Sequence, residues 1–250
     1  MQETLSNRPL VAGNTNTSLL KIIALVFMCM DHVGKVFFPA IPEFRIVGRI
    51  AFPLYCYCAA VGVCYTKSCP KYLLRIFVTG LVSQPLYMWS LGHRWHELNI
   101  FATIFLGVSA LYAIKSKWNY SHIWGPIVAL CLADLIVCDY GWKGVLLIIL
   151  LYFVIHSKPA LISLMVAFCL FWGSTSSTIR SVLGVPLNFT SWPIVGSMLS
   201  SFIRLQGMAI LALPFMLIPM KSKVRLPQWL GYSFYPLHLA VIIAVRELMF

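Results

Sequence analysis

A succession of apolar runs, each about as long as a helix that crosses a bilayer, limits most strongly what this chain can fold into. The runs are bounded by charged residues, Pro or Gly. They fall at 19–38, 46–65, 71–90, 99–114, 122–138, 141–156, 159–173, 205–220 and 228–248. Such lengths are those of helices that satisfy their own backbone hydrogen bonds in lipid. We therefore predict an all-α polytopic membrane protein, a single bundle of about nine transmembrane helices (eight to ten).

Composition agrees with a membrane protein and excludes an ordinary soluble domain. Charged residues make up 10% of the 250 residues and apolar residues 60%, whereas soluble domains carry about 25% charged residues. The start of the chain is polar, so we expect a polar tail over 1–18 and one transmembrane bundle over 19–250. A shorter apolar stretch at 192–203 is interpreted as a half-helix or a re-entrant segment.

The net charge of +12 comes from Lys and Arg residues that lie singly or in pairs between the apolar runs. This distribution is typical of topology signals and of contacts with anionic lipid headgroups. We therefore expect membrane lipid as a partner and no nucleic acid. A modest Lys and Arg excess predicts a cytoplasmic N-terminus in a bacterial inner membrane. The eight cysteines form no C-x-x-C pair, and we interpret them as apolar core residues.

Two polar residues, Asp31 and His32, stand near the end of the first apolar run. A charged side chain at a bilayer centre costs roughly 2.5–3.5 kcal/mol, so their presence needs a reason. If the first two runs form an antiparallel hairpin, Arg45 and Arg49 approach the same depth. Because adjacent residues on a helix face different directions, we expect Asp31 to pair with Arg49 while His32 faces a cavity. Either this pair is purely structural, or it fixes the geometry for proton transfer at His32.

Further polar residues fall on the same predicted side of the bundle. Each alone is typical of a loop or a helix cap, but together they predict a water-filled cavity at the outer side. These residues are Gln84, Asn99, Asp139 and Tyr140. In the last run, Tyr235 and His238 flank Pro236, which would kink the helix. His238 is interpreted either as a structural core residue or as part of the cavity wall.

No spacing in the sequence predicts a metal site. His93 and His96 stand three residues apart, but in a predicted loop with only Glu97 beside them. No Gly-rich phosphate loop and no hydrolase or zinc-protease motif is present.

Several stretches resemble one known family when they are taken in order. They are LKIIALVFMCMDH at 20–32, GRIAFPL at 48–54, the region of Gln84, LNIFA with Asn99, DYGWKG at 139–144 and FYPLHLA at 234–240. The family is that of the TraX proteins, membrane acetylases of conjugative pilin, and the likeness covers most of the chain outside roughly 156–200. TraX proteins are in turn similar to the broader transmembrane acyltransferases.

This resemblance implies acetyl transfer from acetyl-CoA to an amine or hydroxyl acceptor across the membrane, such as a pilin-like N-terminus or an exported glycan. The residues of this chain that match the family's site positions are Asp31, His32, Arg49, Gln84, Asn99, Tyr140 and His238. We expect His32 as general base, held by Asp31 and Arg49. The substrate-binding candidates are Gln84, Asn99, Asp139, Tyr140, Tyr235 and His238. Charge alone nominates the residues that would meet the CoA phosphates, namely Lys67, Lys71, Arg75, Lys221 and Arg225.

Two other functions remain open from the sequence. In a proton-coupled transporter or permease for a small solute, Asp31, His32 and His238 would carry protons or bind the solute, although no internal repeat is visible. In a non-catalytic membrane subunit of a secretion or conjugation system, the same residues would only hold helices together.

Overall fold

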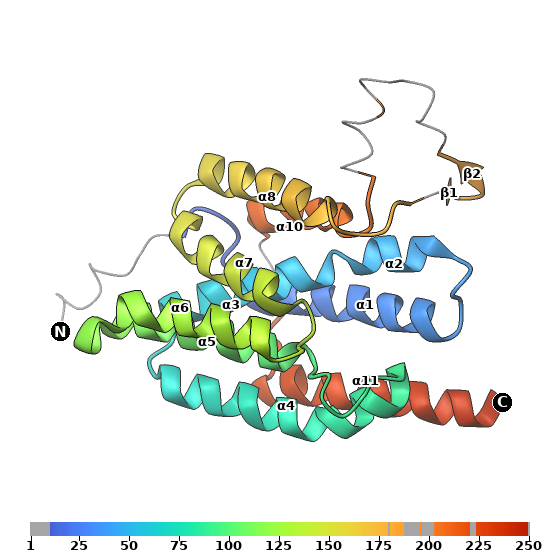
Figure 1. Ribbon diagram of the computed structural model, residues 1–250, viewed down its shortest axis with the longest axis horizontal. Coiled ribbons are helices and arrows are strands. Elements are labelled where there is room, and N and C mark those ends of the chain that lie inside the picture. Colours follow the sequence, from blue (N-terminus) through green and yellow to red (C-terminus); the bar gives the residue numbers. More distant parts are fainter. Residues whose placement is uncertain (1–10, 180, 188–195, 197–202, 221–223, 250) are drawn as a thin grey trace.

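The computed structural model describes residues 11–179, 181–187, 196, 203–220 and 224–249, and this part of the chain is mostly helical (Figure 1). The α-helices are α1 (Thr17–Val36), α2 (Pro42–Gly48), α3 (Ala51–Tyr65), α4 (Cys69–Leu91), α5 (Ile100–Ser116), α6 (Ser121–Leu135), α7 (Gly141–Val154), α8 (Lys158–Gly173), α10 (Leu213–Leu217) and α11 (Gln228–Met249). Two 3₁₀ turns, η1 (Trp118–Tyr120) and η3 (Gly207–Ala212), and a small hairpin of β1 (Ser181–Val182) and β2 (Val185–Pro186) complete it.

Local sequence signals explain where several helices begin. The side chains of Asn16 and Asn99 accept hydrogen bonds from the first-turn amides of Leu19 and Phe101, at 3.1 and 3.0 Å. Each Asn thereby satisfies an amide that has no partner inside its helix. α2, α4 and α8 have Pro in the first turn, where a missing amide hydrogen costs nothing, and α8 is also capped by the side chain of Ser157.

Helix α3 forms the centre of the bundle. It packs against α1, α5 and α7, and Phe52, Leu54 and Tyr57 on it are at most 1% exposed. A helix that is apolar on every side is expected to be enclosed by other helices. In Figure 1, α4 and α11 lie side by side along one edge, while α8 and α10 lie at the opposite edge.

The outer faces of several helices are apolar. On α4 the exposed side chains recur at helical spacing, and they are Leu74, Phe77, Val78, Leu81 and Val82. On α11 they are Leu237, Val241, Val245 and Leu248. A soluble protein places such stripes inward, and a large exposed apolar surface marks contact with a membrane or another protein.

Two of the predicted runs do not form one continuous helix. Run 46–65 is interrupted at Arg49 and Ile50, where α2 ends and α3 begins, and run 205–220 forms only η3 and α10. Within the described residues, two helical segments, Pro42–Tyr65 and Gln228–Met249, are both long and apolar enough to cross a membrane. A bundle of nine full spans is therefore not established by helix length.

Part of the predicted polar tail packs against the bundle. The amide of Ala12 donates to the carbonyl of Ile155 at 2.9 Å, and that of Asn14 donates to the carbonyl of Met216 at 2.7 Å. The hydroxyl of Tyr57 donates to the carbonyl of Asn14 at 3.1 Å. Residues 1–10 of that tail, and all but residues 196 and 203 of the stretch 192–203, lie outside the described residues.

Candidate active site

The hairpin of α1 and α2 brings Asp31 and two arginines together. Its close approach depends on Gly48, because a Cβ added there would overlap the Cβ of Asp31. Arg45 Nε lies 3.0 Å from Asp31 Oδ1, and Arg49 Nη2 forms an ion pair with the same oxygen. The predicted pair of Asp31 and Arg49 is thus present, with Arg45 as an additional partner.

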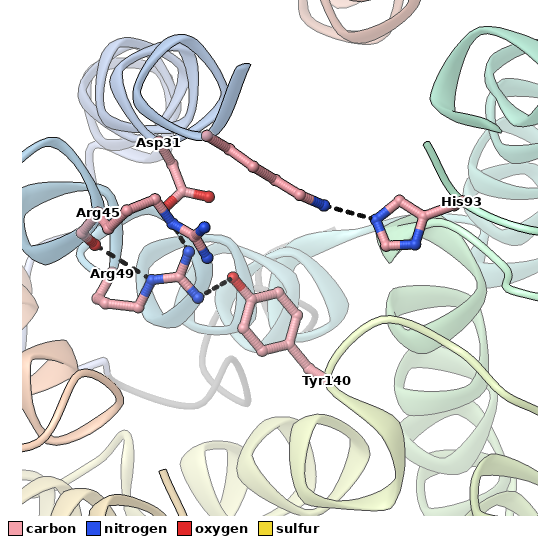
Figure 2. A network of polar contacts seen from close by, with 6 residues as sticks. Asp31, Arg45, Arg49, His93 and Tyr140 are labelled. Carbon is pink, nitrogen blue, oxygen red and sulfur yellow. Dashed lines mark hydrogen bonds and ion pairs between the residues drawn. The ribbon is translucent and has the colours of Figure 1, made fainter. Parts of the chain in front are cut away.

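Arg49 also connects this hairpin to the other side of the bundle (Figure 2). Its Nε donates to the carbonyl of Arg45 at 3.3 Å, and its Nη1 donates to the hydroxyl of Tyr140 at 3.5 Å. The side chain of Arg49 is 6% exposed. Several acceptors around one buried guanidinium compensate for the hydration that it loses.

A strained turn at the start of α7 presents Tyr140 to the site. Tyr140 has a φ of 66° and Gly141 a φ of 52°, and a positive φ is unfavourable for an aromatic residue. The turn is held because the Asp139 amide donates to the Leu98 carbonyl at 2.9 Å, and because the Tyr140 ring stacks on Phe52 with centroids 3.7 Å apart. Strain that is held in place by its surroundings is common at functional sites.

His32 of α1 meets His238 of α11. Its Nδ1 lies 2.8 Å from His238 Nε2, and Nδ1 of His238 lies 3.1 Å from the carbonyl oxygen of Phe234. The ring of Tyr235 packs edge-on against both imidazoles. Residues 206 positions apart in the sequence therefore form one contact.

A second polar chain closes the site on the side of the loop between α4 and α5. Lys35 Nζ lies 2.9 Å from His93 Nε2, and His93 Nδ1 lies 2.9 Å from Glu97 Oε2. Because an ammonium can only donate, His93 accepts from Lys35 and donates to Glu97. The Arg94 amide and the His93 ring lower the pKa of Glu97 by hydrogen bonding to its carboxylate.

These groups surround a polar cavity of about 110 Å³, which we call the outer cavity. Its polar lining comprises Asp31, His32, Lys35, Arg45, Arg49, Tyr55, Tyr87, His93, Asp139, Tyr140 and Tyr235. Residues from α1, α2, α3, α4, α11 and two loops thus enclose one space. Burial raises the pKa of Asp139, which lies in the loop before α7, and the positive charge of Arg49 opposes that rise.

A larger cavity of about 330 Å³, which we call the inner cavity, lies beyond it. Lys21, Tyr72, Arg75 and Gln228 line the inner cavity. The two cavities share four lining residues, Met28, Tyr55, Ile100 and Tyr235. Lys21 and Lys35 are separated by 14 residues of one helix, or about 21 Å at 1.5 Å per residue. The cavities therefore lie in series along α1.

Two predicted substrate residues, Gln84 and Asn99, lie outside both cavities. Asn99 donates from its side chain to Gln84 Oε1 at 2.9 Å, and Gln84 Nε2 donates to the Glu97 carbonyl at 2.7 Å. They line a separate, mostly apolar cavity of about 260 Å³ between α4 and α5. Their polar atoms are used to fasten the loop before α5 to α4, so the expectation that they face the outer cavity was wrong.

The basic residues predicted for the donor are dispersed. Arg75 lines the inner cavity, donates to Gln228 Oε1 at 2.7 Å, and has a buried Nε without a partner among the described residues. Lys67, Lys71 and Arg225 are exposed and do not line it. Lys221 lies outside the described residues.

Sequence reasoning did not assign Lys35, Tyr55, Tyr87 or His93 to the cavity, nor Lys21 to its inner neighbour. Lys35 had a usable signal, because it stands one helical turn after His32. Tyr55 and Tyr87 had none, because a Tyr in an apolar run is typical of ordinary packing. The described residues contain no group of three or more His, Cys, Asp or Glu side chains that could hold a metal ion.

Comparison with known proteins gives a family and two relatives. A family model described as TraX protein matches residues 16–246. An uncharacterised protein of Rickettsia prowazekii (strain Madrid E) is 29% identical over 186 residues, which cover 71% of this chain and 71% of that protein. A probable fimbrial assembly protein of Dichelobacter nodosus, FimC of serogroup H1, is 29% identical over 136 residues, covering 49% of this chain and 55% of that protein. No solved structure matches the chain.

Proposed function

The chain belongs to the TraX family, and from that premise we propose that it is an integral membrane acetyltransferase. Acetyl-CoA is the donor, and an amine or hydroxyl on the opposite side of the membrane is the acceptor. The observation that carries the proposal is the pair of cavities in series, one with Lys21 and Arg75 in its lining, the other polar and lined by His32.

The inner cavity suits the donor. Lys21 and Arg75 supply positive charge for phosphate groups, and the buried, unpartnered Nε of Arg75 is a donor that a ligand would satisfy. Tyr55, Ile100 and Tyr235 lie where the two cavities meet. The narrow thioester arm of the donor would pass between them towards His32.

The outer cavity suits the chemistry. His32 takes the proton from the attacking amine or hydroxyl, which makes the acceptor nucleophilic. The hydroxyl of Tyr140 accepts a bond from Arg49 and is left with its own hydrogen to donate towards the oxyanion that develops on the acetyl carbonyl. Arg49 and Asp31 hold this hydroxyl in place and compensate each other's charge.

Two further features support a location in a membrane and a role in pilus assembly. The outward-facing apolar stripes of α4 and α11 favour a multi-pass protein of the bacterial inner membrane, with Lys21 and the N-terminus on the cytoplasmic side, where acetyl-CoA is made. The relative named as a probable fimbrial assembly protein favours a pilin-like N-terminus as the acceptor. An exported glycan is the alternative acceptor.

The test is acetyl transfer by the purified protein in lipid nanodiscs. Acetyl-CoA labelled in its acetyl group is incubated with a peptide that has a free N-terminal amine, and the peptide is analysed by mass spectrometry. We expect one acetyl group on the peptide from the wild type and from His122→Ala, whose side chain is exposed on α6, and none from His32→Ala of equal stability. Full transfer by His32→Ala would refute the assignment, and solute uptake without any need for acetyl-CoA would favour a transporter.

A further inference from the structure

We infer that His238 is a positioning residue that fixes the tautomer of His32, leaving Nε2 of His32 as the atom that takes the proton. The geometric part of this inference concerns only the two imidazoles. Its catalytic part rests on the proposed acetyl transfer.

The tautomer follows from one backbone acceptor. Nδ1 of His238 lies 3.1 Å from the carbonyl oxygen of Phe234, and a carbonyl oxygen can only accept. His238 must therefore have its hydrogen on Nδ1, and in the neutral ring Nε2 is an acceptor. The nitrogen 2.8 Å away is Nδ1 of His32, which must donate. His32 is then protonated on Nδ1 and has a lone pair on Nε2.

The ring geometry supports a directed hydrogen bond. The planes of His32 and His238 lie within 14° of parallel, and their centroids are 5.1 Å apart. The two facing nitrogens are 2.8 Å apart, and the rest of the centroid separation equals one ring radius on each side. The two centroids and the two nitrogens therefore lie nearly on one line. The rings thus lie edge to edge in nearly one plane, and the N–H of His32 points along its own bond direction at the acceptor.

The surroundings keep His238 in this orientation. It is 8% exposed, its carbonyl partner lies one turn earlier on the same helix, and Tyr235 packs edge-on against its ring with centroids 5.2 Å apart. Among the described residues, His32 forms its hydrogen bond through Nδ1 and none through Nε2, and it lines the outer cavity. A buried acceptor behind the base and a free lone pair in front of it form the arrangement that orients a general base.

The proton balance is simple. As the acceptor nitrogen forms its bond to the acetyl carbonyl carbon, its proton passes to Nε2 of His32, which becomes an imidazolium. The Nδ1–H of that imidazolium stays bonded to Nε2 of His238, which stabilises the positive charge. The tetrahedral intermediate then collapses as its C–S bond breaks, and the CoA thiolate that leaves takes the proton from Nε2 of His32.

Two substitutions separate positioning from packing. His238→Leu keeps a side chain that branches at Cγ but removes the acceptor, and we expect kcat to fall by about 10²–10⁴-fold, the range that general-base catalysis supplies, with KM for acetyl-CoA unchanged. His238→Gln can place its side-chain oxygen near the position of Nε2 in His238. We therefore expect kcat of His238→Gln to be at least about tenfold higher than kcat of His238→Leu. A purely structural role predicts equal losses in both variants that follow their stability.

The tautomer itself is read by nitrogen NMR of protein labelled at its six histidines, with the His32 signals assigned by their loss in His32→Asn. We expect hydrogen on Nδ1 of His32 in the wild type and in His238→Gln, and a mixture in His238→Leu. Hydrogen on Nε2 of His32 in the wild type would overturn the inference, whether or not the protein transfers acetyl groups. The expected tautomer without any transfer by the wild type would leave the positioning intact and refute the proposed function.

Discussion

Arg49 joins three separate parts of the chain, since it contacts Asp31 on α1, the carbonyl of Arg45 on α2 and the hydroxyl of Tyr140 before α7. A lysine would keep the charge, but it has no planar fork with which to reach three acceptors at once. Arg45 contacts the same carboxylate, yet its side chain is 32% exposed. The two arginines therefore differ in what they stabilise, although they share a partner.

Replacing Arg49 with lysine tests this difference. We expect Arg49→Lys to lower the free energy of unfolding by about 1.5–3 kcal/mol, because charged hydrogen bonds to buried acceptors are lost. Arg45→Lys, the matched control, changes it by less than about 1 kcal/mol, because the Arg45 side chain is partly exposed and a lysine can keep the ion pair. Unfolding in mixed detergent micelles measures both, and equal losses would contradict a special role for Arg49.

At the scale of elements, the site depends on how closely α1 and α2 approach and on how the loop between α4 and α5 is held. Gly48 permits the close approach of α1 and α2, because any side chain there would meet Asp31. The hydrogen bonds from Lys35 to His93 and from His93 to Glu97 hold the loop between α4 and α5. Both features set the position of groups around the outer cavity without contributing a reacting atom.

Adding one methyl group to Gly48 tests the close approach. We expect Gly48→Ala to cost about 1–3 kcal/mol of stability through overpacking and to reduce acetyl transfer, because Asp31 must move. In Gly62→Ala the new Cβ would meet the Tyr72 ring at an ordinary 3.5 Å, so stability is kept. Thermal unfolding in nanodiscs measures the Tm of both variants. An unchanged Tm for Gly48→Ala would show that α1 and α2 can move apart without loss of stability.

The loop between α4 and α5 is expected to loosen in acid. Because the pKa of Glu97 is lowered in the folded protein, its bonds stabilise the loop above the pKa of the unfolded state and are lost as the pH falls through the folded pKa. Hydrogen exchange should show protection of the Arg94 amide, which donates to Glu97 at 2.8 Å, falling below about pH 4.5. Glu97→Gln should lack this dependence, and the same dependence in that variant would assign it to another group.

At the scale of the whole molecule, helices with apolar outer faces enclose two cavities that lie in series. The exposed apolar stripes of α4 and α11 are unfavourable in water and indicate that these faces contact an apolar environment. The inner and outer cavities meet at Met28, Tyr55, Ile100 and Tyr235. In the proposed function, the donor enters through the inner cavity and the acceptor through the outer cavity.

A single lysine on the outer face distinguishes a lipid environment from water. In Val241→Lys, a charge near the middle of α11 would face lipid and cost roughly 2.5–3.5 kcal/mol, so we expect less protein in the membrane fraction. Leu248→Lys places the same charge in the last turn of the same helix and should be tolerated. Equal membrane levels of the two variants would contradict a transmembrane α11.

The sequence predicted the hairpin pair best and the distant contacts least. Asp31 and Arg49 could be matched because depth along two consecutive helices is simple arithmetic. The break at Arg49 and Ile50 carried no Pro or Gly signal strong enough to locate it, and the bond between His32 and His238 joins helices whose packing no periodicity specifies. Gln84 and Asn99 were predicted to face the outer cavity because they are polar. In the structure, the Asn99 side chain caps α5 and the Gln84 side chain holds the loop before α5.

The most direct measurement places donor and acceptor on opposite sides of a membrane. The protein is reconstituted into sealed vesicles that enclose a peptide with a free N-terminal amine, and acetyl-CoA labelled in its acetyl group is added outside. Two cavities in series predict labelled peptide inside intact vesicles that contain the wild type and none in those that contain His32→Ala. Enclosed peptide that is labelled only after the vesicles are opened with detergent would contradict a path through the bundle.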